Sequence, residues 1–152
     1  MTLTGGVLAM KEIMVAYWSG TGNTAAMATI LGKGIQDGGA AAKVVSVEDI
    51  KADDLKDYPV FALGCPSMGN ETLEETVMED FVTEVESFAS GKKIGLFGSY
   101  GWGDGEWMRN WVSRMEDAGA QVFGGEDAIC MNEPDAEAEE KLEALGKELA
   151  AL

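Results

Sequence analysis

Short apolar runs alternate with segments of helical periodicity along the chain. Five apolar runs predict strands, at 11–18, 43–47, 60–64, 93–97 and within 121–131, the last broken around Gly124-Gly125. Apolar residues spaced by three and four predict helices between the strands, at 23–37, 73–88, 106–118 and 135–152. The acidic segment 48–58 is expected to contain one short helix as well. The pattern is a repeated strand–helix alternation.

The strand-like runs are apolar on both faces, as Val60-Phe61-Ala62-Leu63-Gly64 shows most clearly. Strands of this kind that alternate with helices form a parallel sheet covered on both sides. The predicted fold class is therefore α/β, a three-layer doubly wound five-stranded parallel sheet. With 152 residues the chain has room for one such domain, assigned to 11–152, with 1–10 as an N-terminal extension or leader.

The charge balance is strongly acidic. Eleven Lys and Arg face 27 Asp and Glu, a formal net charge of −16. Nucleic acids and anionic membranes would repel such a surface, whereas basic protein partners would be attracted in a salt-sensitive way. No apolar run approaches the ~20 residues of a membrane span, and residues 1–10 lack a basic segment typical of secretion signals. We expect a cytoplasmic monomer.

The residues that usually perform acid–base or metal chemistry are scarce. There is no His, and the only cysteines, Cys65 and Cys130, do not form a CxxC pair. The chain thus lacks the commonest general base and metal ligand, and no metal site or redox disulfide is expected.

A loop of small residues and hydroxyls follows the first strand: Ser19-Gly20-Thr21-Gly22-Asn23-Thr24. A strand, a tight loop and a helix start aim backbone N–H groups at a phosphate. Because the loop has no Lys or Arg, the anion would be held by amides, hydroxyls and the Asn23 side chain. Gly20-x-Gly22-x-x-Ala25 also fits a dinucleotide fingerprint, but Glu48, the nearest acidic candidate for the ribose, comes late. A glycine-rich turn without ligand is the second alternative.

A second loop, Gly64-Cys65-Pro66-Ser67-Met68-Gly69-Asn70-Glu71, follows the third strand. Its residues 68–71 suit a four-residue turn whose central peptide can flip. Asn70 tolerates the positive φ of a type II turn, and Gly69 supplies that of a type II′ turn. A static surface turn is the simpler interpretation.

A third loop, Ser99-Tyr100-Gly101-Trp102-Gly103-Asp104-Gly105, follows the fourth strand. Glycines let the backbone approach a planar ring, and an aromatic side chain can stack on it. We expect Trp102, which has a glycine on each side, to contact a ligand, and Trp18, Trp107 and Trp111 to pack in the core. The fold would gather all three loops at one edge of the sheet.

Together the three loops resemble the flavodoxin family, in its short-chain type from anaerobic bacteria. The likeness rests on Tyr-Trp-Ser-Gly-Thr-Gly-Asn-Thr at 17–24, Gly-Cys-Pro-x-Met-Gly-Asn-Glu at 64–71 and Leu-Phe-Gly-Ser-Tyr-Gly-Trp-Gly at 96–103. It covers nearly the whole chain from Met10 onward. The resemblance implies one non-covalently bound FMN and a low-potential one-electron carrier that cycles between semiquinone and hydroquinone.

The resemblance also implies roles for residues. In the first loop Ser19, Thr21, Asn23 and Thr24, with the amides of Gly20 and Gly22, would bind the FMN phosphate. Met68 and Trp102 would lie on opposite faces of the isoalloxazine, and the Glu71 side chain would accept the flavin N3–H. A flip of the 69–70 peptide would let the Gly69 carbonyl accept the N5–H. The further implied contacts are Pro66, Ser67, Asn70, Ser99, Tyr100, Gly101 and Gly103.

Two features of the resemblance concern function. Some relatives carry Ser where this chain has Pro66, which cannot supply that hydroxyl to the phosphate. The implied partners are redox proteins otherwise served by ferredoxin, such as ketoacid oxidoreductases, hydrogenases and ferredoxin/flavodoxin reductases.

Two other functions are alternatives to an electron carrier: a small flavin- or NAD-dependent reductase, and a redox-silent binding module. We expect a carrier, not an enzyme.

Overall fold

The computed structural model describes residues 11–152. They form five strands, four α-helices and two short 3₁₀ helices. The strands are β1 (Glu12–Tyr17), β2 (Ala41–Ser46), β3 (Val60–Gly64), β4 (Lys93–Tyr100) and β5 (Gln121–Met131). The helices are α1 (Asn23–Asp37), η1 (Val47–Asp49), η2 (Ala52–Leu55), α2 (Met78–Glu86), α3 (Glu106–Asp117) and α4 (Ala136–Ala150). The proposed leader, residues 1–10, lies outside the described residues.

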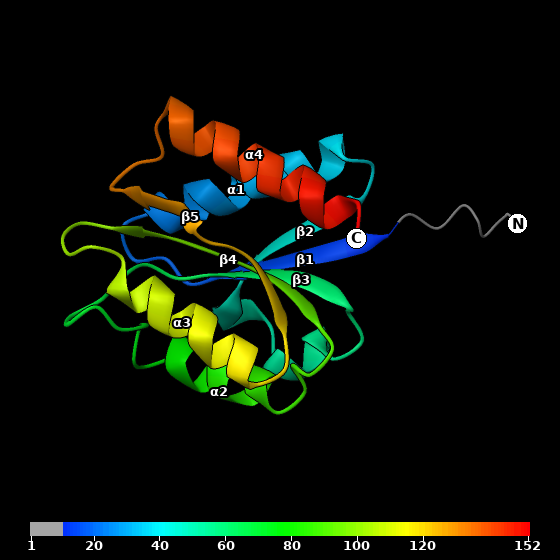
Figure 1. Ribbon diagram of the computed structural model, residues 1–152, viewed down its shortest axis with the longest axis horizontal. Coiled ribbons are helices and arrows are strands. Elements are labelled where there is room, and N and C mark those ends of the chain that lie inside the picture. Colours follow the sequence, from blue (N-terminus) through cyan, green and yellow to red (C-terminus); the bar gives the residue numbers. More distant parts are fainter. Residues whose placement is uncertain (1–10) are drawn as a thin grey trace, which may run out of the picture.

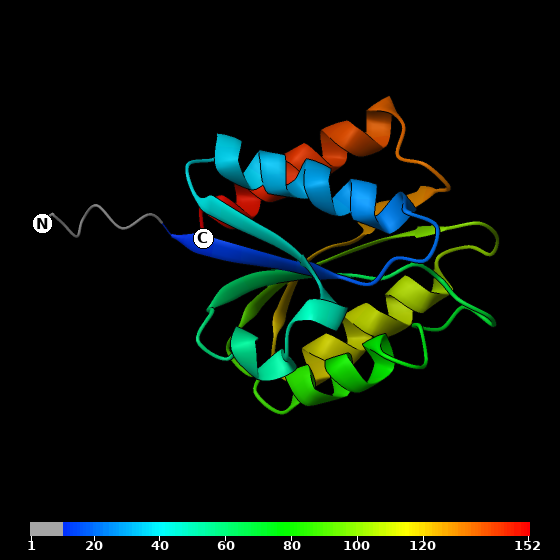
Figure 2. The ribbon, with the colours of Figure 1, turned by 180° about the vertical axis from the view of Figure 1, so that it is seen from behind.

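All five strands are parallel and follow the order β2-β1-β3-β4-β5. Helices α1 and α4 cover one face of the sheet and α2 and α3 the other (Figures 1 and 2). The chain moves outward from β1 to β2, then returns past β1 to build β3, β4 and β5 on the other side. The predicted three-layer doubly wound sheet is confirmed, and its order reverses between β1 and β3.

Alternating side chains of the strands enter two separate cores. Ile13 and Val15 of β1 pack with Met27, Leu31 and other residues under α1 and α4. On the opposite face, the neighbouring strand positions pack under α2 and α3, where Trp107 and Trp111 are 1% exposed. Burial on both faces explains why the central strands have no polar alternation.

Helix α2 is shorter than the sequence predicts. The apolar spacing predicts a helix over 73–88, but α2 spans only Met78–Glu86. Before it, the buried carboxylate of Glu74 accepts hydrogen bonds from the N–H groups of Thr76, Val77 and Met78, at 2.8–2.9 Å. Because one side chain accepts these N–H groups, the backbone before α2 forms a turn and not a helix. Leu73 is therefore a buried residue of a loop.

Other boundaries also differ from the prediction. Strand β4 continues to Tyr100, because it pairs with β5 up to Met131, so Ser99 and Tyr100 belong to a strand and not to a loop. Strand β2 begins earlier and ends one residue sooner, and the segment after it holds two 3₁₀ turns in place of one short helix. The break expected at Gly124-Gly125 is a register shift within a continuous β5.

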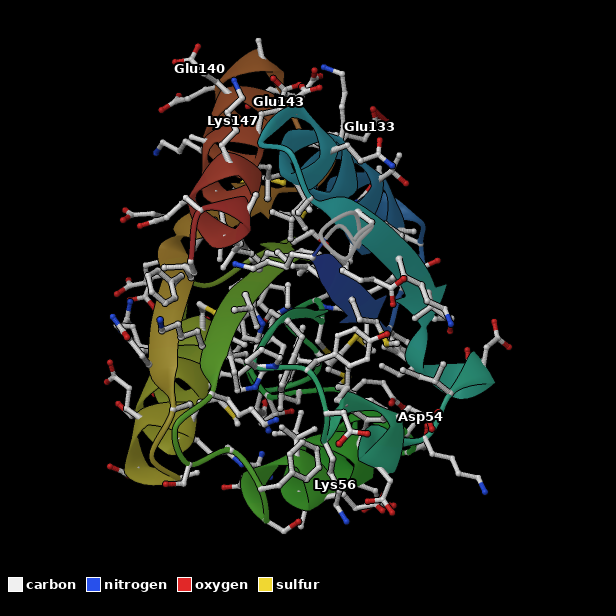
Figure 3. The ribbon with its side chains drawn as sticks, turned by 90° about the vertical axis from the view of Figure 1, so that its right-hand side faces the viewer. Asp54, Lys56, Glu133, Glu140, Glu143 and Lys147 are labelled. Carbon is white, nitrogen blue, oxygen red and sulfur yellow. The ribbon has the colours of Figure 1, made fainter. Side chains whose placement is uncertain are left out.

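Helices α1 and α4 approach each other through glycines. A Cβ at Gly34 would lie 2.5 Å from the Glu143 carbonyl oxygen, and one at Gly146 would lie 2.6 Å from the Leu31 carbonyl oxygen. Lys33 also pairs with Glu143 at 3.2 Å across this contact. Figure 3 shows Glu143 on the side of α4 next to α1, and Glu140 and Asp54 pointing outward on opposite sides of the molecule.

Within residues 11–152, no helix is long and apolar enough to cross a membrane.

Candidate functional site

The three predicted loops meet at the carboxyl edge of the sheet, where the strand order reverses. Backbone hydrogen bonds hold their starts together: Trp18 N–H donates to Gly64 C=O at 3.0 Å, and Ser67 N–H donates to Ser99 C=O at 2.9 Å. This is the position at which doubly wound sheets bind ligands. In Figure 1 this edge faces away from the labelled C-terminus.

A cavity of about 210 Å³ opens between the loops. It is lined by Trp18, Gly20, Thr21, Asn23, Pro66, Ser67, Met68, Ser99, Tyr100, Gly101 and Asn132. Typical ligand pockets span about 300–1,000 Å³, so a ligand larger than this cavity would have to extend across its rim. A hollow of about 520 Å³ between α3 and β5 is larger, but it lies beside Arg109, Glu126 and Asp127, away from the loops after β1 and β3.

The first loop ends in a helix N-terminus that is suited to an anion. Gly22 precedes α1 with φ +99°, a conformation that residues other than glycine rarely adopt. The N–H groups of Asn23 and Thr24 then lie in the first helical turn, where helix geometry supplies no acceptor. The helix dipole adds positive potential, and no acidic residue occupies that turn.

The Ser19 hydroxyl orders this loop and keeps its proton available. Its oxygen accepts hydrogen bonds from Gly22 N–H at 3.1 Å and Ala25 N–H at 3.3 Å. A serine hydroxyl has one donor and two acceptor positions. Both bonds use the acceptor positions, so the O–H remains free to donate to a bound anion.

Thr24 ties this loop to the end of β4. Its hydroxyl is buried and lies 3.0 Å from the Ser99 hydroxyl, which joins the first turn of α1 to the strand that carries the third loop. A pair of hydroxyls needs only one of its protons for the mutual bond. The pair therefore holds two of the loops together and can still donate once.

The second loop is closed one residue later than expected. Met68 and Thr72 exchange two backbone hydrogen bonds of 2.9 Å, so Gly69, Asn70 and Glu71 form the loop tip in place of a 68–71 turn. Gly69 has φ +50° and Glu71 has φ +56°. Of the two turns considered, the positive φ at Gly69 is that of the type II′ form. Whether the 69–70 peptide flips stays a prediction.

Glu71 reaches the N-terminus of α3. Its Oε1 accepts the N–H of Glu106 at 3.0 Å, and a Cβ at Gly103 would lie 2.5 Å from its Cδ. Glycine at 103 thus makes room for the carboxylate. The resemblance implies that the same side chain accepts the flavin N3–H. Its bond to Glu106 joins the second loop to the start of α3, directly after the third loop.

The third loop contains one exposed and one buried aromatic residue. Trp102 is 59% exposed at the rim and does not line the cavity. Trp107 is buried, packs against Tyr100 with ring centroids 5.6 Å apart, and donates its Nε1–H to the Cys65 carbonyl at 3.1 Å. Trp107 therefore supports the site from beneath, and Trp102 lies where a ring across the rim could stack.

The structure brings nine of the predicted residues to the cavity wall: Gly20, Thr21, Asn23, Pro66, Ser67, Met68, Ser99, Tyr100 and Gly101. Ser19, Gly22 and Thr24 belong to the same first loop, and Gly69, Asn70, Glu71, Trp102 and Gly103 belong to the rim loops.

Sequence reasoning missed two residues of the wall. Trp18 was expected in the core, but it is only partly buried and lines the cavity as well as packing against the core. Asn132 directly follows β5 and lines the cavity, and its N–H donates to Tyr100 C=O at 2.8 Å. Its φ of +60° is a backbone signal that only the structure displays; an Asn directly after a strand was the available hint.

The two cysteines are poorly suited to reaction. Burial raises the pKa of the Cys65 thiol to about 12, and burial also raises that of Cys130, to about 11. Both thiols are therefore protonated near neutral pH, and a thiol reacts as its thiolate. Within residues 11–152, no cluster of three or more His, Cys, Asp or Glu side chains could hold a metal ion.

Fold and site together define a doubly wound α/β domain with a cavity and a helix N-terminus suited to an anion where its strand order reverses. The flavodoxin family model matches residues 15–146. The chain is 46% identical over 136 residues to a flavodoxin of Clostridium beijerinckii, covering 90% of this chain and 97% of that protein. It is 49% identical over 123 residues to a flavodoxin of Megasphaera elsdenii, covering 81% and 88%. The chain belongs to the flavodoxin family, whose members bind FMN and carry electrons.

The solved structures agree. The solution structure of two-electron reduced Megasphaera elsdenii flavodoxin superposes with a TM-score of 0.82 at 45% identity, covering 90% of this chain and 98% of that one. A flavodoxin from the domain Archaea superposes with a TM-score of 0.80 at 28% identity, covering 92% and 96%. The resemblance stated from the three motifs, to short-chain flavodoxins of anaerobes, is confirmed.

Proposed function

We propose that the cavity between the three loops holds the phosphate and adjoining part of FMN, with the ring system extending across the rim toward Trp102. The observation that carries this is the set of unused donors around one cavity. The Ser19 proton and the first-turn N–H groups of α1 lie within or beside its wall. A neutral donor set of this kind fits a phosphate that must be held without a cation.

The first loop supplies the phosphate contacts in this proposal. Ser19, Thr21, Asn23 and Thr24 donate from side chains, and Gly20 donates from its backbone amide. The amide of Gly22, which the resemblance also implies, already donates to Ser19 Oγ at 3.1 Å and would have to share its proton with the phosphate. Ser19 is already oriented by two N–H groups, so its proton points away from the helix at no further cost in side-chain freedom. Preorganised donors of this kind favour tight binding.

The rim loops supply the ring contacts. Met68 lines the cavity, and Trp102 lies exposed on the third loop. The polarisable Met side chain and the indole face both favour an aromatic ring between them. Glu71 and the backbone around Gly69, Asn70, Gly101 and Gly103 would face the polar edge of the ring system.

The chain acts in this proposal as a one-electron carrier between proteins and does not itself convert a substrate. FMN supplies the redox chemistry when bound, and the protein tunes its potential. A net charge of −16 disfavours each further negative charge on the cofactor, so the second electron is accepted only at a strongly reducing potential. The absence of His leaves no usual acid–base group for a reductase reaction.

The partners proposed are redox proteins with basic docking surfaces, of the kind otherwise served by ferredoxin, and the proposed location is the cytoplasm. Complementary charge increases the association rate of such partners, and salt weakens the complex by screening that charge. No partner with an acidic surface, and no nucleic acid, fits this charge.

Stepwise anaerobic reduction of the FMN-loaded protein tests the proposal. We expect the visible bands of bound flavin and a broad long-wavelength absorption that rises to half reduction and then falls. Flavin that bleaches in a single two-electron step, together with NAD(P)H oxidation in the absence of any partner protein, would instead identify a reductase. If the purified protein binds no added FMN, a redox-silent binding module would be the only remaining alternative.

A further inference from the structure

The third loop has few contacts that fix its shape, although it carries Trp102. Three of its five residues between β4 and α3 are glycines, at 101, 103 and 105, and glycine leaves the backbone more freedom than any other residue. Within residues 11–152, no backbone N–H of residues 101–104 donates to a backbone carbonyl. The loop depends on side chains to hold Trp102 in one place.

Arg109 of α3 contacts the end of this loop. Its Nη1 donates to the Asp104 carbonyl oxygen at 3.0 Å, and its Nη2 donates to the Asp104 carboxylate at 3.0 Å. The planar guanidinium thus binds the backbone and the side chain of one residue through two nitrogens, a geometry that the single ammonium group of lysine does not reproduce. Asp104 is two residues from Trp102, so this contact limits the freedom of the loop next to the indole.

A third hydrogen bond joins Arg109 to β5. Its Nη1 also donates to the Glu126 carboxylate at 3.1 Å, and the two side chains pass close to Gly105, the last residue of the loop. Glu126 lies where β5 changes register against β4, between Gly124 and Ile129. A bulge of this kind redirects a side chain. Here it places a carboxylate that holds the guanidinium in position.

The three side chains of this network are exposed, Arg109 by 43%, Asp104 by 77% and Glu126 by 52%. Ion pairs at such exposure contribute little to the stability of a fold. The network can still act on a ligand, because a loop that is already ordered loses less freedom when it closes on a bound ring. Its effect should appear in cofactor affinity more than in the free energy of unfolding.

We infer that Arg109 is a positioning residue for the cofactor: it holds the third loop through Asp104, so that Trp102 is ready to stack on the ring system of FMN. The inference rests on the proposed function, in which that ring extends across the rim toward Trp102. Arg109 itself does not line the cavity between the loops. It brings α3 and, through Glu126, the bulge of β5 into the construction of the site.

Fluorescence titration of the cofactor-free protein with FMN tests the inference. Arg109→Gln removes the guanidinium, and Arg109→Lys keeps the charge without the planar fork. We expect FMN to bind about 3- to 10-fold more weakly to both, because the loop must then become ordered on binding. Arg114→Gln is the matched control, since it removes the other arginine of α3, whose guanidinium binds Glu79 and Glu86 of α2. Its FMN affinity should equal that of the unchanged protein.

A double-mutant cycle shows whether Arg109 acts through Trp102. Arg109→Gln is combined with Trp102→Ala, so that no indole remains to be positioned. A positioning role predicts little further loss of FMN affinity in this background, whereas a general structural role predicts the same loss in both backgrounds. Riboflavin, which lacks the phosphate, should show the same fold-change as FMN with Arg109→Gln alone, because Trp102 is expected on the ring.

Several results would overturn the inference: unchanged FMN affinity of Arg109→Gln, full affinity of Arg109→Lys, or an equal loss in Arg114→Gln. An equal loss with and without Trp102, or a loss confined to FMN and absent with riboflavin, would overturn it as well. In each of these cases the unchanged protein still binds FMN, so the proposed function stands. Failure of the unchanged protein to bind FMN would instead contradict the proposed function itself.

Discussion

The carboxylate of Glu71 accepts the backbone N–H of Glu106 at 3.0 Å and so connects the two loops that form the rim of the cavity. Glu71 is the last residue of the 69–71 loop tip, and Glu106 is the first residue of α3. A carboxylate at a helix N-terminus satisfies an N–H that has no partner in the helix and interacts favourably with the helix dipole. One side chain therefore sets the distance between the second and third loops.

Replacing Glu71 by Gln is expected to lower the free energy of unfolding of the cofactor-free protein by about 0.5–1 kcal/mol, because the dipole interaction loses its charge. Urea unfolding at low and high ionic strength measures the effect, which should be smaller in high salt. Glu133→Gln, an exposed carboxylate in the loop after β5, is the control. If the two variants are equally stable, the Glu71–Glu106 contact contributes nothing.

The Glu74 carboxylate makes stability depend on pH. Burial alone would raise its pKa, but hydrogen bonds from the Thr76 hydroxyl and from the N–H groups of Met78, Val77 and Thr76 outweigh burial and lower the pKa to about 2. Because the folded pKa lies below the ordinary value of 4.5, the stabilisation is present above about pH 5 and is lost as pH falls toward 2. It amounts to roughly 3 kcal/mol.

Glu74→Gln should therefore be less stable than the unchanged protein at pH 7, and the difference should shrink steadily between pH 5 and pH 2. Urea midpoints across this range measure it. The neighbouring exposed Glu75 is the control, because Glu75→Gln should leave the pH profile unchanged. A constant difference between Glu74→Gln and the unchanged protein at all pH values would argue against the proposed linkage.

The α1–α4 contact predicts an unequal response to two glycine substitutions. Gly146→Ala would place its Cβ 2.6 Å from backbone atoms of Leu31 and Ile35, which cannot move without separating the helices, so we expect it to destabilise the protein by about 1–3 kcal/mol. At Gly32 the nearest atom is Cγ2 of Val44, a half-exposed side chain that can turn away.

Gly32→Ala should accordingly be neutral or stabilising by up to about 1 kcal/mol, since Ala favours a helix over Gly. Chemical unfolding followed by circular dichroism compares the two variants. Similar losses at both positions would mean that helix packing is not limited by the backbone approach at Gly146.

The acidic surface predicts opposite salt effects on electron transfer to small oxidants. The rate of oxidation of the reduced FMN-loaded protein by hexaammineruthenium(III), a cation, should fall as ionic strength rises, and the rate with the ferricyanide anion should increase. Stopped-flow absorption measures both. Equal slopes for the two oxidants would mean that the charge of −16 is not felt at the cofactor edge.

The sequence by itself determined the strand–helix alternation and the three loops that meet at one edge of the sheet, because apolar runs such as 60–64 record burial on both faces and the loop 19–24 carries its donors consecutively. Only the tertiary structure decided the start of α2, the end of β4 and the cavity wall. The Glu74 carboxylate accepts N–H groups of the residues that follow it, so the helix does not begin at 73 as its apolar spacing predicts. Strand β4 extends beyond its predicted end at 97 because β5 pairs with it as far as Met131. Asn132 and the Glu71–Glu106 bond depend on contacts between segments distant in sequence, which local periodicity does not record.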